Sequence, residues 1–260
     1  MDRRTFQRYC SALALGRCLA WPAAGWTAPS NIALSILAYH RFGPTVADSM
    51  TVRSASFAAQ LQFLREHAYR IVSLRQAVLA LQTHAPLPAR AVAITVDDGH
   101  RTVYSDLLPL VLREQIPVTL FIYPSAISNA AYAMSWQQLA ELQASGYFDI
   151  QSHTYWHPNF KIEKRRLAPP AYARFVQMQL EKPRQVLQQK LGVEADLLAW
   201  PFGIYDEELM VAARAAAYLA AFSIDARPVS ANDPLLALPR FLMVDSQGVH
   251  GLAKLLGEPQ

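Results

Sequence analysis

Short apolar runs, many of them rich in β-branched residues, recur along the chain and are separated by more polar segments. Each run has the length of a buried strand. The seven runs cover residues 32–39, 91–96, 117–123, 148–152, 196–200, 219–223 and 240–244. Helical patterns lie between most of them, and this alternation predicts parallel βαβ units in an α/β fold. The pattern alone does not decide between a closed barrel and an open sheet.

Two of the intervening segments carry clear helix signals. Residues 57–67 place Phe57, Leu61 and Leu64 on one face of an amphipathic helix. Further on, Ser135 begins a capping-box pattern that starts a second helix, and this helix is expected to end at Gly146.

Two other segments are harder to interpret. Residues 171–191 have a helical pattern but contain Pro183, which predicts a break or a kink. The basic stretch 160–170 is predicted to be a loop. A solvated surface connection is the favoured interpretation of this loop, and contact with an anionic cell envelope is the alternative.

The N-terminus differs from the rest of the chain. Arg3 and Arg4 precede an apolar segment over residues 9–21, and small residues follow it. This order predicts an export signal over residues 1–29, and therefore a periplasmic or secreted domain over residues 30–260. The twin arginine resembles a Tat signal, and a Sec-type signal stays open. Because Arg17 interrupts the apolar segment, a short amphipathic helix of the fold is the alternative.

The charges and cysteines support the removal of this leader. The whole chain has 24 basic and 20 acidic residues, a net charge of +4, and residues 1–29 contribute four arginines and one aspartate. The remainder therefore carries only +1, which does not favour a nucleic-acid partner. Both cysteines lie in the leader, so the predicted mature domain has neither a disulfide nor a thiolate ligand. No run is long and apolar enough to predict a transmembrane helix.

Candidate chemistry lies where two of the predicted strands end. Asp97 and Asp98, followed by Gly99, come after the run 91–96, and His153 and His157 come after the run 148–152. A buried carboxylate is costly without a partner or a metal. One carboxylate and two imidazoles form a three-ligand set that leaves a position open on Zn²⁺, and the second carboxylate is then free to act as a base. Taken separately, the first motif is more often a turn and the second a solvated helix face.

Further polar groups are expected at the same edge, because parallel α/β folds place their chemistry at the carboxyl ends of strands. His40 follows the run 32–39, and Pro201, Phe202 and Gly203 follow the run 196–200. The Phe202 backbone N–H is a candidate donor to an oxyanion. Pro201 has no N–H, and Gly203 allows the chain to turn.

These motifs resemble a known family. The segments TVDDG, SHTYWHP and AWPFGIY resemble the first three motifs of the NodB-type polysaccharide deacetylases. ILAYHRF and LPRFLMV resemble the branch that deacetylates poly-β-1,6-N-acetylglucosamine during biofilm export. The resemblance covers roughly residues 32 to 245. It implies a distorted (β/α) barrel with about seven parallel strands and a divalent metal, with Zn²⁺ the expected ion.

The resemblance also implies the order of roles in the aspartate pair, which the residues alone leave open. Asp97 corresponds to the catalytic base. Asp98 corresponds to the metal ligand, together with His153 and His157. Arg240 is expected to pair with the base, in place of an arginine that many relatives carry at the third motif.

The general acid is assigned to His40, because the first strand resembles a strand that many relatives carry near the C-terminus. A structural role for His40 is the alternative. His100, beside the aspartate pair, and His250, near the C-terminus, are the rival candidates for the acid.

The favoured function is metal-dependent removal of N-acetyl groups from an N-acetylglucosamine polymer, with poly-β-1,6-N-acetylglucosamine of a biofilm matrix as the expected substrate. Chitooligosaccharide and peptidoglycan are alternative substrates, and association with a polysaccharide export system is expected. A glycoside hydrolase would use Asp97 and Asp98 across a sugar bond, but adjacent strand residues point to opposite faces. A non-catalytic carbohydrate-binding or export protein would not need both the ligand and the base positions.

Overall fold

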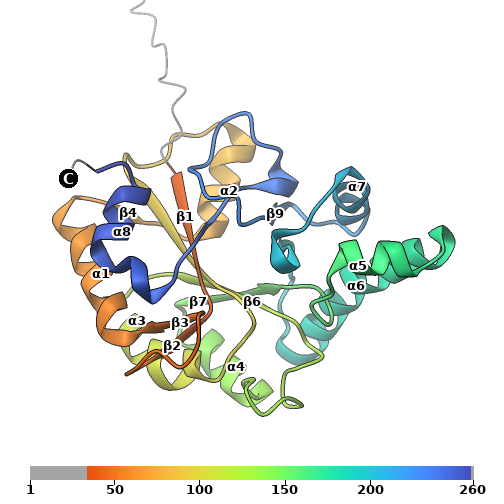
Figure 1. Ribbon diagram of the computed structural model, residues 1–260, viewed down its shortest axis with the longest axis horizontal. Coiled ribbons are helices and arrows are strands. Elements are labelled where there is room, and N and C mark those ends of the chain that lie inside the picture. The colour runs from red at the N-terminus through yellow and green to blue at the C-terminus, as the bar shows by residue number, and fades with distance from the viewer. Residues whose placement is uncertain (1–33, 259–260) are drawn as a thin grey trace, which may run out of the picture. The chain divides into compact units, whose positions relative to one another are not determined.

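A computed structural model describes residues 34–258 of the chain (Figure 1). The predicted export signal over residues 1–29 lies outside the described residues. Seven strands form one continuous parallel sheet in the order β10-β1-β5-β6-β7-β8-β9. The strands are β1 (Leu34–Tyr39), β5 (Ala91–Val96), β6 (Val118–Ile122), β7 (Phe148–Ser152), β8 (Leu197–Ala199), β9 (Ala220–Phe222) and β10 (Phe241–Leu242). Each predicted apolar run therefore contains one strand.

The described residues also include three short strands that the apolar runs did not predict. β4 (Arg70–Ile71) pairs with the beginning of β5, so eight strands belong to the main sheet. β2 (Arg41–Gly43) and β3 (Thr51–Arg53) form a separate parallel pair just after β1. Two or three residues are too few for a hydrophobic pattern to stand out, so these strands carried no signal of their own.

The main sheet curls, so that the segment 238–242 lies near both β9 and β1. Leu238 forms a parallel bridge with Phe222 of β9, and its N–H donates to the carbonyl of Ala221. Three residues later, β10 pairs with Leu37 and Ala38 of β1. The segment 238–242, which includes the edge strand β10, therefore contacts β9 on one side and β1 on the other, and the predicted distorted (β/α) barrel is confirmed.

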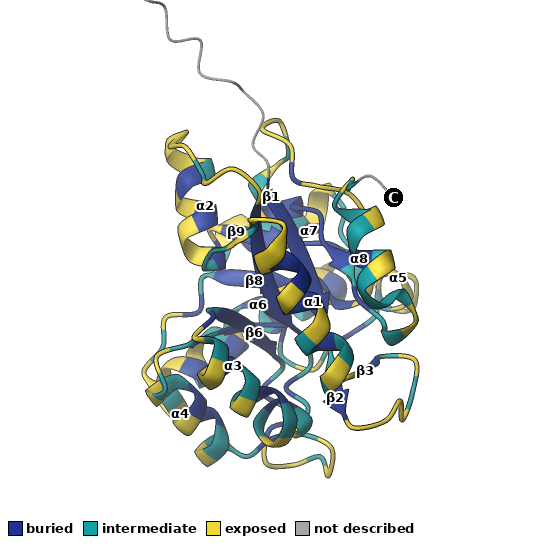
Figure 2. Ribbon diagram, turned by 90° about the vertical axis from the view of Figure 1, so that its left-hand side faces the viewer, coloured by how far each residue is buried: buried dark blue, intermediate teal, exposed yellow. Residues whose placement is uncertain are grey.

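Eight α-helices lie around this sheet within residues 34–258. They are α1 (Ser54–Glu66), α2 (Leu74–Thr83), α3 (Leu108–Glu114), α4 (Trp136–Ala144), α5 (Phe160–Arg166), α6 (Pro169–Leu191), α7 (Glu207–Ala215) and α8 (Gly248–Leu255). Figure 2 shows that the seven strands of the continuous sheet are largely buried and that the helices expose their outer faces. The core is therefore formed by the sheet together with the inward faces of the helices.

The capping-box prediction is confirmed at the start of α4. The Ser135 hydroxyl accepts from the N–H of Gln138 at 3.1 Å, and the Gln138 side-chain oxygen accepts from the N–H of Ser135 at 2.9 Å. Two of the backbone donors that a helix start leaves unpaired are thereby satisfied. The helix ends at Ala144, close to the predicted stop at Gly146.

Two predictions about the following segments are wrong, namely a loop over residues 160–170 and a break at Pro183. Residues 160–166 form the helix α5 instead of a loop, because Asn159 caps its first turn by accepting from the Ile162 N–H at 3.1 Å. Three basic residues occupy the last turn, where the helix dipole favours positive charge. Pro183 does not break α6, which runs without interruption from Pro169 to Leu191. Pro183 is buried, and the tertiary packing of α6 outweighs the one hydrogen bond that proline removes.

Candidate active site

The turn that follows β5 directs the carboxylates of Asp97 and Asp98 differently. The Asp97 N–H still donates to the carbonyl of Tyr39 in β1, at 2.9 Å. The next two residues, Asp98 and Gly99, have positive φ angles of 74° and 75°. A Cβ at Gly99 would lie 3.0 Å from a side-chain carbon of Ile122, so glycine relieves both the strain and the crowding there. The sharp turn separates the directions of two adjacent carboxylates.

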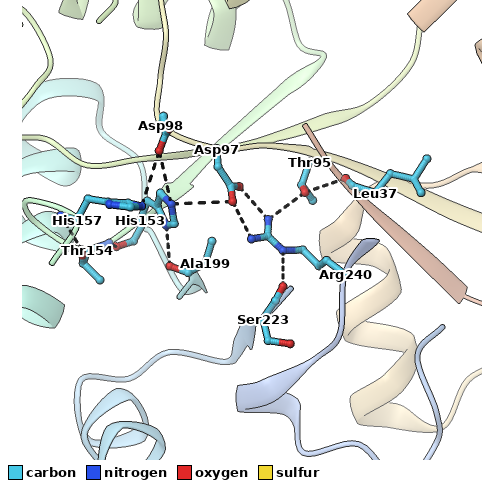
Figure 3. Close-up of polar contacts among 11 residues, drawn as sticks. Leu37, Thr95, Asp97, Asp98, His153, Thr154, His157, Ala199, Ser223 and Arg240 are labelled. Carbon is cyan, nitrogen blue, oxygen red and sulfur yellow. Dashed lines mark hydrogen bonds and ion pairs between the residues drawn. The ribbon is translucent and has the colours of Figure 1, made fainter. Parts of the chain in front are cut away.

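Asp97 is buried and paired with Arg240. The two Arg240 Nη atoms donate to the two carboxylate oxygens of Asp97 at 2.8 and 2.7 Å, and neither side chain is more than 3% exposed. Arg240 also donates to the Thr95 hydroxyl and to the Ser223 carbonyl, each at 3.0 Å (Figure 3). Every part of the guanidinium is therefore oriented, and the carboxylate is held in one position.

The pKa of Asp97 reflects two opposing effects. Burial alone would raise this pKa, because it penalises the charged form. The Arg240 guanidinium and, next to it, His153 act in the opposite direction, and the net result is a pKa well below the ordinary value. Asp97 is therefore ionised at neutral pH.

His153 has a defined tautomer. Its Nδ1 lies 2.8 Å from the Ala199 carbonyl oxygen, which can only accept, so Nδ1 carries the proton. The other ring nitrogen, Nε2, lies 3.8 Å from an oxygen of Asp98 and 3.9 Å from an oxygen of Asp97. A backbone carbonyl is one of the usual partners of the other ring nitrogen in a metal-binding imidazole.

His157 completes a set of three potential ligands. Its Nε2 lies 3.9 Å from the same oxygen of Asp98, and burial, followed by the nearby His153, lowers the pKa of His157 to about 4. One ligand atom from each of Asp98, His153 and His157 lies within 4.8 Å of the others. Zn²⁺ binds nitrogen and oxygen ligands at about 2.0–2.2 Å. The three groups are therefore close enough to share one divalent ion.

His40 lies in the same pocket. Its Nδ1 is buried and has no hydrogen-bond partner among residues 34–258. Burial lowers the pKa of His40, although Asp97 and Asp98 oppose the effect.

The pocket has a volume of about 200 Å³ and combines a polar side with an apolar side. The polar side consists of the groups already described. The apolar side is formed by Met50, Trp200, Phe202, Ile224 and Leu242. Phe202 has a positive φ of 56°, is 55% exposed, and packs with its ring 4.6 Å from that of His157. At Gly203 a Cβ would approach Ile224 to 2.4 Å, so only glycine fits.

The two rival histidines do not line the pocket. His100 directs Nδ1 to the Thr102 hydroxyl at 2.9 Å and stacks on Tyr132. His250 is exposed on α8. Of the three candidates for the general acid, the structure brings only His40 into the pocket.

Sequence reasoning missed two supporting residues, Tyr123 and Thr95. Tyr123, at the end of β6, packs its ring 5.3 Å from that of His157 and donates to or accepts from the Tyr132 hydroxyl at 2.5 Å. Thr95 links Arg240 to the Leu37 carbonyl. Tyr123 could have been found, because it lies at the end of a predicted strand. Thr95 could not, because a threonine inside an apolar run does not indicate a buried polar contact.

Comparison with known proteins gives the family. The model of a family described as polysaccharide deacetylase matches residues 84–221, which contain the aspartate pair and both histidines. The chain belongs to the polysaccharide deacetylase family. It is therefore an enzyme of this family, as the motifs predicted.

Relatives of this deacetylase include enzymes named for a specific polymer. A poly-β-1,6-N-acetyl-D-glucosamine N-deacetylase of Staphylococcus aureus is 23% identical over 205 residues, covering 77% of this chain and 70% of the relative. An Escherichia coli protein of the same name is 24% identical over 270 residues, covering 90% of this chain and 39% of the relative.

Solved structures share the fold of this deacetylase. A Streptococcus pyogenes deacetylase in complex with acetate superposes with a TM-score of 0.76 at 21% identity, covering 87% of this chain and 98% of the other. IcaB from Ammonifex degensii gives 0.74 at 25% identity, covering 86% of this chain and 96% of the other.

Proposed function

We propose that this deacetylase is a metal-dependent N-deacetylase and that its substrate is poly-β-1,6-N-acetylglucosamine. The observation that carries the proposal is the arrangement of two neighbouring aspartates. Asp98 shares a 4.8 Å cluster with two imidazoles, while Asp97 faces Arg240 and is ionised. One carboxylate is placed to hold a cation and the other to accept a proton.

Asp98, His153 and His157 would hold the metal, and their donor types fit Zn²⁺. When bound, the cation would supply Lewis-acid polarisation of the acetyl carbonyl and of the attacking water. The Ala199 carbonyl keeps the proton of His153 on Nδ1, so Nε2 can donate its electron pair. A cation at these ligands would thus need no change of tautomer.

Asp97 acts as the base in this proposal. A carboxylate oxygen of Asp97 takes a proton from water, the water oxygen forms a bond to the acetyl carbon, and the C–N bond later breaks to give acetate and an amine. Arg240 fixes the direction of the carboxylate and keeps it ionised, which also makes it a weaker base. We infer that orientation contributes more here than basicity.

His40 and Phe202 complete the reaction. His40 would give a proton to the departing amine nitrogen, and this role is supported by its place in the lining of the pocket. The Phe202 N–H would donate to the developing oxyanion. The apolar side chains of Phe202, Ile224 and Leu242 would contact the acetyl methyl group.

The polymer assignment is supported by the names of the Staphylococcus aureus and Escherichia coli relatives. A biofilm role, association with an export system and a periplasmic or secreted location follow from the same assignment and from the predicted leader. No helix among residues 34–258 is long and apolar enough to cross a membrane.

Acetate release tests the chemistry and the substrate together. Wild-type and Asp97→Asn enzymes would be compared on poly-β-1,6-N-acetylglucosamine, chitooligosaccharides and peptidoglycan. Asparagine is nearly isosteric but cannot take the proton, so we expect kcat to fall by about 10²–10⁴-fold with metal content unchanged. Equal activity of the two enzymes would contradict the mechanism. Activity on chitooligosaccharides or peptidoglycan alone would contradict the substrate but not the mechanism.

A further inference from the structure

Both histidine ligands of the candidate site lie at the ends of one short loop, residues 153–157. Thr154 and His157 adopt positive φ angles of 66° and 63°, which are unfavourable for residues with a side chain. A loop with two such residues keeps this shape only if its surroundings hold it. The spacing of the two imidazoles therefore depends on what fastens the loop.

The middle of the loop is fastened by one side chain from α6. The Gln179 side-chain oxygen accepts from the backbone N–H of Tyr155 at 3.2 Å and from that of Trp156 at 3.1 Å. Gln179 is fully buried. Its amide nitrogen faces the sulfur of the adjacent Met178 at 3.7 Å, so its oxygen is directed at the loop. Glutamine is rarely buried to this extent without a specific task.

A backbone contact also reaches the middle of the loop, because the Ser125 N–H donates to the Tyr155 carbonyl at 3.1 Å, and further contacts hold the ends. The Ser152 hydroxyl accepts from the Thr154 N–H at 3.2 Å and from the Tyr218 hydroxyl at 2.8 Å. The Thr154 hydroxyl accepts from the His157 N–H at 3.2 Å. Within residues 34–258, no side chain other than that of Gln179 accepts from the two central amides. Both donors would be left unpaired without it.

We propose that Gln179 is a positioning residue for the metal site, one that sets the separation of His153 and His157 by holding the loop between them. It touches neither the ligand nitrogens nor the pocket, and it acts through the backbone of Tyr155 and Trp156. The inference rests on the proposed function, because it needs the two histidines to be ligands. Outer-shell partners of this kind typically change metal affinity by about 10–100-fold.

The test is the affinity for Zn²⁺ of the metal-depleted full chain, measured by competition with a chromogenic chelator. Gln179→Met keeps the size of the side chain but cannot accept in the same way, so we expect Zn²⁺ to bind about 10–100-fold more weakly. Gln179→Glu keeps an oxygen for both amides and should restore the affinity. Gln177→Met, on the exposed face of the same helix, is the matched control and should bind as the wild type does.

Two further measurements do not depend on activity. The visible spectrum of the Co²⁺-loaded protein reports ligand geometry, and we expect it to change in Gln179→Met and to recover in Gln179→Glu. Amide exchange of Tyr155 and Trp156 in the metal-free wild type should be slow, because the anchor exists before metal binds. This measurement tests the proposal even if Gln179→Met does not fold.

The outcomes separate the inference from the proposed function. Unchanged Zn²⁺ affinity in a folded Gln179→Met, or unprotected amides in the wild type, would overturn the role of Gln179 alone. A wild type that binds no divalent metal, or one whose metal survives His153→Ala, would overturn the proposed function as well.

Discussion

Two arginine–aspartate pairs with nearly the same geometry lie at opposite ends of the sheet. At the carboxyl end, Arg240 contacts both oxygens of Asp97 at 2.8 and 2.7 Å. At the amino end, Arg75 of α2 contacts both oxygens of Asp196, just before β8, at 2.9 and 2.8 Å. A second carboxylate, Asp149 in β7, lies 3.3 Å from Arg75.

The two pairs differ in their contact with water. Arg240 and Asp97 are 0% and 3% exposed, whereas Arg75 and Asp196 are 45% and 13% exposed. An exposed pair is screened and contributes little to stability, while a buried charge left without its partner is costly. At the amino end of the sheet, this contact joins α2 to the sheet. At the carboxyl end, the same contact holds the charge of Asp97 beside the candidate metal ligands.

The two pairs should differ most in the loss of unfolding free energy when the arginine of each pair is replaced. Arg240→Met leaves Asp97 buried without its partner and should lower the free energy of unfolding by about 3–5 kcal/mol. Arg75→Met leaves its carboxylates within reach of water and should cost at most about 1 kcal/mol. Urea unfolding of both variants measures the difference. Equal losses would mean that burial does not separate the two pairs.

His40→Gln should affect catalysis without a comparable effect on metal binding. Loss of a general acid slows turnover by about 10²–10⁴-fold, so kcat should fall while the metal content stays at the wild-type level. His100→Gln and His250→Gln are the controls, because neither histidine lines the pocket. An unchanged kcat in His40→Gln, with a loss in His100→Gln, would transfer the role to His100.

The histidines at the carboxyl end of the sheet should also make the unfolding free energy of the metal-free protein decrease in acid. The folded pKa of His157 is about 4, below its ordinary value of 6.5, and the pKa of His40 is also lowered. The unfolded chain then binds more protons, so the unfolding free energy is largest above pH 6.5 and decreases as the pH falls towards 4. We expect a loss on the order of 1–3 kcal/mol. His157→Gln should reduce the slope, and an unchanged slope would contradict the lowered pKa.

Much of the carboxyl end could be predicted because its signals are local. Asp97 and Asp98 directly follow an apolar run, which predicts both the strand and the candidate site residues at its end. His153 and His157 likewise follow an apolar run. The pairing of Arg240 with Asp97, expected from the family resemblance, is present in the structure.

Other features depend on contacts between distant segments and left no local signal. Gln179 and Thr95 contact groups that lie 24 and 145 residues away in the chain. The helix α5 was missed because its basic residues were attributed to a solvated loop, whereas Asn159 and the helix dipole stabilise it. The sequence could not tell that Trp200 is buried, with its indole N–H donating to the Leu236 carbonyl, while Trp156 is 47% exposed.

The central claim is that Asp98, His153 and His157 hold the metal on which deacetylation depends. The most direct test measures metal content and acetate release of the wild type, His153→Ala and His157→Ala, with the exposed His250→Ala as the control. We expect one divalent ion per chain in the wild type and the control. Chelation should remove the ion and the activity together, and both histidine variants should lose both. Full metal content and undiminished acetate release in His153→Ala and His157→Ala would contradict the account.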